Sequence, residues 1–97
     1  MPTYISLCRY TQKGVENVKD SPTRLDAAKK LWKSMGAELK AFYLAMGQYD
    51  MVVIGEAPDG ETMTKLALTI ASKGALRCES FQVFKEDEYR KIINDLP

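Results

Sequence analysis

The sequence predicts an α+β domain in which four strands and two helices follow one another in the order βαββαβ. Residues 3–10 alternate in the period-two pattern of a strand. Two segments, residues 21–35 and 61–73, carry apolar side chains at helical spacing, and each is followed by a stop glycine, Gly36 and Gly74. With no linker and no low-complexity tract, residues 1–97 are expected to form a single domain.

The charge balance and hydrophobicity of the chain limit the partners and the location that can be expected. The 14 Lys and Arg residues nearly balance the 13 Asp and Glu residues, so neither nucleic acid nor an anionic membrane surface is an expected partner. No apolar run approaches the roughly 20 residues that cross a bilayer, and the N-terminus lacks the layout of a signal peptide. A cytoplasmic location is therefore expected.

The chain contains no histidine, which removes Ser–His and Cys–His nucleophile pairs and His-ligated metals. Its carboxylate clusters lack the spacing of a calcium loop, so no metal and no other cofactor is expected. Cys8 and Cys78 are far apart in sequence, within predicted strands, and are expected to be reduced core thiols.

In the first half of the chain, the polar residues 11–20 predict a loop after the first strand. Ser21 is expected to cap the following helix and Pro22 to occupy its first turn. The apolar stripe of this helix includes Trp32, whose side chain should pack on the sheet, find a partner for its indole N–H and emit blue-shifted fluorescence.

In the second half, residues 37–46 form an extended run that breaks at a two-residue turn, Gly47-Gln48. The strand over residues 49–57 is apolar at consecutive positions, which indicates that both of its faces are covered. Asp59 should cap the second helix. Residues 75–84 are expected to form the last strand and residues 86–96 a terminal helix.

This order is the ferredoxin-like arrangement, an antiparallel sheet in the strand order 4-1-3-2 with the helices on one face. The two central strands are apolar on both sides, so a second copy of the chain should cover the remaining face. A homodimer or larger symmetric assembly is expected, and Val52→Asp or Val53→Asp should prevent folding or assembly.

Residues 43–58 contain Gly47, Tyr49 and Asp50 at the predicted hairpin, and this segment resembles the signature of the GYD family. The resemblance implies a dimeric α/β barrel, in which two ferredoxin-like sheets face each other. The wider fold group includes cofactor-free monooxygenases, isomerases, haem enzymes and small-molecule sensing domains, so fold alone leaves the function open.

Two groups of residues are candidates for ligand binding. The first surrounds the hairpin, where a turn exposes backbone amides and side chains supply aromatic walls and charges: Tyr10, Tyr49, Asp50, Arg9 and Tyr43. The second is a small polar and aromatic set on one face of the first and last strands, including Ser6, Cys8, Cys78 and Ser80. Alternatively, the hairpin residues have a purely structural role. In that case Gly47 is needed for its backbone freedom, Tyr49 for packing across strands and Asp50 for a hydrogen bond to turn amides.

The favoured function is a small-ligand-binding or cofactor-independent enzyme module, and no catalytic residue is assigned. The alternative is a non-catalytic oligomeric structural or regulatory domain. The expected partners are a second copy of the chain and, in the ligand-binding case, a small molecule. Haem binding, a third hypothesis, would need Tyr, Cys or Met as the axial ligand because histidine is missing.

Overall fold

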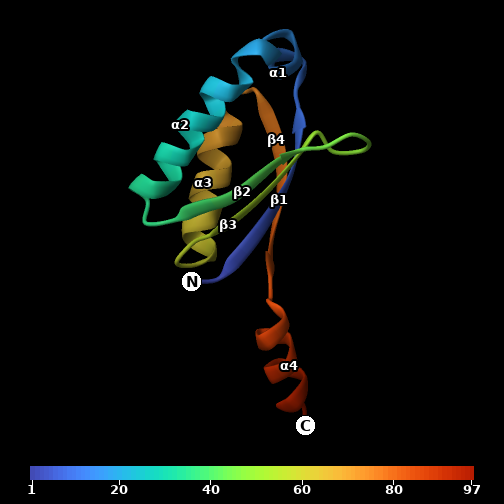
Figure 1. Ribbon diagram of the computed structural model, residues 1–97. Coiled ribbons are helices and arrows are strands. Elements are labelled where there is room, and N and C mark those ends of the chain that lie inside the picture. The colour runs from blue at the N-terminus through green and yellow to red at the C-terminus, as the bar shows by residue number, and fades with distance from the viewer.

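Four antiparallel strands and two packed helices make up the body of the protein in the computed structural model, which describes residues 1–97 (Figure 1). The elements are β1 (Thr3–Tyr10), α1 (Gln12–Glu16), the 3-10 turn η1 (Val18–Asp20), α2 (Ser21–Ser34), β2 (Glu38–Leu44), β3 (Met51–Glu56), α3 (Gly60–Ser72), β4 (Leu76–Val83) and α4 (Glu86–Asn94). The sheet order β2-β3-β1-β4 is the predicted ferredoxin-like order counted from the other edge. None of the helices is long and apolar enough to span a membrane.

Helices α2 and α3 both lie on one side of the sheet (Figure 1). Pro22 lies in the first turn of α2, and Gly36 follows the helix with φ 74°. Asp59 caps α3 as predicted, since its carboxylate accepts a 2.8 Å hydrogen bond from the backbone N–H of Thr62. Gly74, with φ 84°, lies just beyond the end of α3.

The buried core lies between these helices and the sheet. It is built from apolar side chains of β1, α2 and α3 and from two alanines next to strand ends: Tyr4, Trp32, Ala37, Ala57, Met63 and Leu66. The helical stripes recognised in the sequence therefore face the sheet, as predicted.

The other face of the sheet has no helix over it (Figure 1). Alternation along the strands places apolar side chains there, and the strand register pairs Ile5 with both Ile54 and Phe81, and Leu7 with Val52. We call these five residues, Ile5, Leu7, Val52, Ile54 and Phe81, the open face. Within one chain they remain partly exposed, so the second covered face predicted for β3 needs another molecule.

Helix α4 projects beyond the sheet as an arm (Figure 1). The carboxylate of Glu88 accepts a 2.9 Å hydrogen bond from the backbone N–H of Lys85 at its start. Tyr89, Ile92 and Ile93 are all at least 44% exposed, so this arm also presents apolar surface that its own chain does not cover.

Three local predictions are wrong. The predicted loop over residues 11–20 contains α1 and η1, because the Thr11 hydroxyl accepts a 3.1 Å hydrogen bond from Gly14 N–H and starts a helical turn. Ser21 does not cap α2, since its hydroxyl lies 2.9 Å from the Tyr10 hydroxyl. The β2–β3 connection is six residues long rather than two, because β2 ends at Leu44 and β3 begins at Met51.

Candidate functional site

The loop between β2 and β3 is fastened to the end of β1 by Asp50. The Asp50 carboxylate accepts a 2.9 Å hydrogen bond from the backbone N–H of Tyr10, and the Asp50 N–H donates to the Cys8 carbonyl at 2.8 Å. Gly47 has φ 112°, a conformation that favours glycine. The glycine and the aspartate thus hold the loop in place, Asp50 by bonding a strand amide rather than a turn amide.

Tyr49 forms a polar cluster with Arg9 and Glu79. Its hydroxyl donates a 3.0 Å hydrogen bond to the Glu79 carboxylate, and the Arg9 guanidinium lies 4.8 Å from the centre of its ring. The hydrogen bond to Glu79 raises the pKa of Tyr49, and burial raises it further. Glu79 lies between Cys78 and Ser80, which face the helices, so this cluster lies at one end of the open face.

The remaining predicted ligand residues lie elsewhere. The Tyr10 hydroxyl points to the helix side, where it contacts Ser21. Tyr43 is 58% exposed on β2, opposite Val52. The structure therefore gathers Arg9, Tyr49 and Asp50 around the loop and leaves Tyr43 apart, and ligand binding by these five residues stays a prediction.

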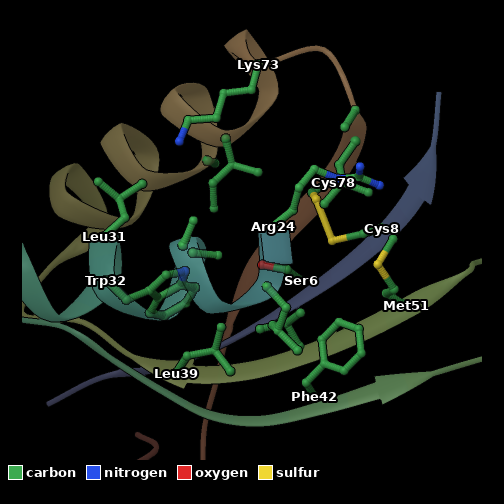
Figure 2. Close-up of a pocket in the computed structure, with 18 of the residues that line it drawn as sticks. Ser6, Cys8, Arg24, Leu31, Trp32, Leu39, Phe42, Met51, Lys73 and Cys78 are labelled. Atoms are coloured by element: carbon green, nitrogen blue, oxygen red, sulfur yellow. A yellow bond between two sulfur atoms is a disulfide. The ribbon is translucent and has the colours of Figure 1, made fainter. Parts of the chain in front are cut away.

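A cavity of about 130 Å³ lies between α2, α3 and the sheet (Figure 2). Of its 21 lining residues, 16 are hydrophobic, including Leu31 and Trp32 from α2 and Leu39 and Phe42 from β2. None of the five hairpin candidates lines it. Part of the second set proposed from the sequence does: Ser6, Cys8, Cys78 and Ser80 line it, with the Ser6 and Ser80 hydroxyls 2.7 Å apart, whereas Tyr4, Tyr10 and Gln82 of that set do not.

One end of this cavity is cationic. Helix α2 begins, and α3 ends, near the pair Tyr10 and Leu76, where β1 finishes and β4 starts. This topology brings Arg24 of α2 and Lys73, which follows α3, to the same end of the cavity. Neither residue was predicted from the sequence, because only the antiparallel packing of the helices brings these two distant cations together.

Trp32 occupies the other end, two helical turns from Arg24. Its side chain is 2% exposed, and its ring packs so closely over Gly55 that a Cβ atom there would lie 2.8 Å from Cη2. Burial is as predicted, but the expected partner of the indole N–H is missing, since Nε1 is buried without a hydrogen bond. A buried donor left unpaired costs about 1–3 kcal/mol.

Cys8 and Cys78 form a disulfide that belongs to the cavity wall (Figure 2). The prediction of two reduced, buried thiols is therefore wrong. The two residues are direct partners in the β1–β4 register, with Cα atoms 4.1 Å apart, so pairing places their side chains together. Cys78 is exposed because β4 is an edge strand.

Alkylation will check this pairing. The unfolded, unreduced protein should take up no iodoacetamide, and the same protein treated with a reductant should take up two equivalents, as read by intact mass. Labelling of both cysteines without reductant would show free thiols instead. A Cys78→Ser variant, with one remaining thiol, serves as the control for a single label.

The fold, the uncovered sheet face and the small apolar cavity define the class of ferredoxin-like α+β domains. Within this class the chain belongs to the GYD domain family, whose match spans residues 4–93. A relative from Thermus thermophilus, the glutamine synthetase and cystathionine beta-lyase binding protein, is 33% identical over 78 residues, which cover 79% of this chain and 82% of the relative.

Solved structures show the same fold. A feast or famine regulatory protein from M. tuberculosis, complexed with L-methionine, superposes with a TM-score of 0.66 at 13% identity, over 88% of this chain and 51% of that one. TTHA0845 from Thermus thermophilus superposes with a TM-score of 0.56 at 21% identity, over 88% of this chain and 95% of that one.

Proposed function

We propose that this protein is a small-ligand-binding module with a regulatory role, working as a homodimer. The cavity carries the proposal. It is apolar, it lies inside the fold rather than at a loop, and its volume is close to the roughly 150 Å³ at which an engineered cavity takes up benzene. Two buried donors without partners, Nη2 of Arg24 and Nε1 of Trp32, belong to residues of its wall.

The lining favours binding over catalysis. Its polar members are three serines, Arg24 and Lys73, with no carboxylate, phenol or imidazole that could exchange a proton near neutral pH. In their disulfide form, the two cysteines offer no thiolate nucleophile. Carboxylates and imidazoles are the groups that most often transfer protons in cofactor-independent enzymes, so this lining supports a binding role.

The relatives support the regulatory part of the proposal. One relative is named for binding glutamine synthetase and cystathionine beta-lyase, and one structural neighbour is a regulatory protein complexed with L-methionine. A module of this kind would couple the filling of its cavity to a protein–protein contact. In the proposed homodimer a second copy packs on the open face, and the partly exposed apolar residues of β1, β3 and β4 support this arrangement.

The predicted cytoplasmic location remains part of the proposal. In a reducing compartment Cys8 and Cys78 are expected as thiols, whereas the disulfide persists in an oxidising one. The redox state of this pair in cell extracts quenched with acid will therefore test the location.

The ligand-binding function can be tested by filling the cavity. Ala67 lines it from α3, so Ala67→Leu should occupy part of its volume, whereas Leu68→Ala changes the neighbouring, 65% exposed position. The protein is screened by NMR against ring-sized carboxylates, amides and amines. Shifts at cavity residues are expected in the native protein and in Leu68→Ala but not in Ala67→Leu, and a screen without any cavity shift would contradict the proposal.

A further inference from the structure

We infer that the cavity selects a compact carboxylate, with an apolar body the size of one ring or one branched chain. This inference rests on the proposed ligand-binding function and adds the chemical class of the ligand. Three features of the lining carry it: the cationic end, the apolar middle and the unpaired indole N–H at the far end.

The cationic end lacks a counter-charge. Neither Arg24 nor Lys73 takes part in any of the ion pairs of the structure, all of which lie elsewhere. Lys13 adds a third positive charge there, because its ammonium group donates a 3.3 Å hydrogen bond to the Lys73 carbonyl. Three cations without a carboxylate partner form a site that attracts anions and repels amines.

The guanidinium group of Arg24 has an unpaired hydrogen-bond donor. One guanidinium nitrogen, Nη1, donates a 2.9 Å hydrogen bond to the Asn17 carbonyl, while Nη2 is buried and has no partner. A planar guanidinium matches the two oxygens of a carboxylate, and bonds between two ionised groups are about twice as strong as neutral ones. A ligand carboxylate would supply the acceptor that this chain itself does not provide.

The middle of the cavity limits the rest of the ligand. Apart from the Ser6–Ser80 hydroxyl pair, the rest of the wall is formed by aliphatic, aromatic and sulfur-containing side chains, among them Leu31, Val53 and Ile70. Such a wall accepts an apolar body without penalty and strongly disfavours an unpaired polar group. A volume of about 130 Å³ is close to that of a cavity that takes up benzene, so it limits the apolar body to about one ring and excludes larger cofactors.

Trp32 adds a second point of recognition. Arg24 and Trp32 are eight residues apart in α2, which corresponds to about 12 Å along the helix axis. One ligand carboxylate therefore cannot bond both donors. An oxygen at the far end of the apolar body can accept from Nε1 of Trp32, so a para-oxygenated ring should bind more tightly than a bare one.

The test compares 3-phenylpropanoate with its amide and with 3-phenylpropylamine, which share a ring and a chain and differ in charge. Binding is followed by calorimetry and by the emission of Trp32, the only tryptophan. The carboxylate should bind at least about tenfold more tightly than the amide, and the amine most weakly. The 4-hydroxyphenyl carboxylate should gain a further factor of about three to ten, and this gain should be lost in Trp32→Phe.

Removing the charge of Arg24 tests whether this residue binds the ligand carboxylate. Arg24→Gln should weaken carboxylate binding about ten- to hundredfold and leave amide binding unchanged. Lys29→Gln, at an exposed position of α2 outside the cavity, is the matched control and should have no effect. Equal affinity for carboxylate and amide, or an Arg24→Gln variant with unchanged carboxylate affinity, overturns the inference while leaving the ligand-binding function intact. A cavity that none of these compounds enters, and that also shows no shift in the NMR screen, overturns both.

Discussion

Gly55→Ala is expected to lower the free energy of unfolding by about 2–3 kcal/mol, a large effect for the addition of one methyl group. A Cβ atom at position 55 would lie 2.8 Å from both Cη2 of Trp32 and the carbonyl oxygen of Glu38. The carbonyl belongs to the backbone of β2, so it cannot rotate away, and the indole could move only into the cavity that it lines. The tryptophan ring or the β2–β3 pairing must therefore shift.

Gly60→Ala provides the control for this substitution. Gly60 is the first residue of α3, and the nearest heavy atom to a Cβ there is the Tyr4 hydroxyl oxygen at 3.9 Å, an ordinary contact. Urea denaturation of both variants should show a stability loss at position 55 and none at position 60. Equal stability of the two variants would mean that Trp32 does not pack on Gly55.

Val53→Asp and Val52→Asp are expected to fail in different ways, because these neighbours in β3 face opposite sides of the sheet. Val53 packs against the core and lines the cavity, so a carboxylate there should cost about 3 kcal/mol or more and unfold much of the protein. Val52 belongs to the open face, opposite Leu7. Val52→Asp should leave the monomer folded and weaken the dimer by at least about a hundredfold.

Circular dichroism and light scattering at micromolar concentration separate these outcomes. Val52→Thr and Val53→Thr, which keep the branched shape without a charge, serve as controls for strand propensity. A native-like dimer of Val52→Asp would show that the open face is not the interface, and a native protein that scatters as a monomer would contradict the homodimer itself. A fully folded Val53→Asp would contradict the placement of Val53 beneath the helices.

The length of the β2–β3 connection could not be predicted from the sequence. Glycine, tyrosine and aspartate marked a turn, and a turn is present, but six residues separate the strands. The extra length follows from long-range bonds: Asp50 bonds the backbone of Tyr10 and Cys8, both some 40 residues away along the chain. A local sequence pattern contains no information about such distant partners, and so Tyr49 and Asp50 lie in the loop rather than in the strand predicted over residues 49–57.

The sequence alone determined the order of the four strands and the three longer helices, the stripes that face the core, the stops at Gly36 and Gly74, and the presence of a second apolar sheet face. These features follow from periodicity and backbone freedom, which are local properties of the chain. Tertiary structure alone decided that Cys8 meets Cys78 and that Arg24 and Lys73 share one end of a cavity whose other end is Trp32. Those juxtapositions depend on strand register and helix packing, which bring Cys8 to Cys78 across 70 positions and leave no periodic trace in the sequence.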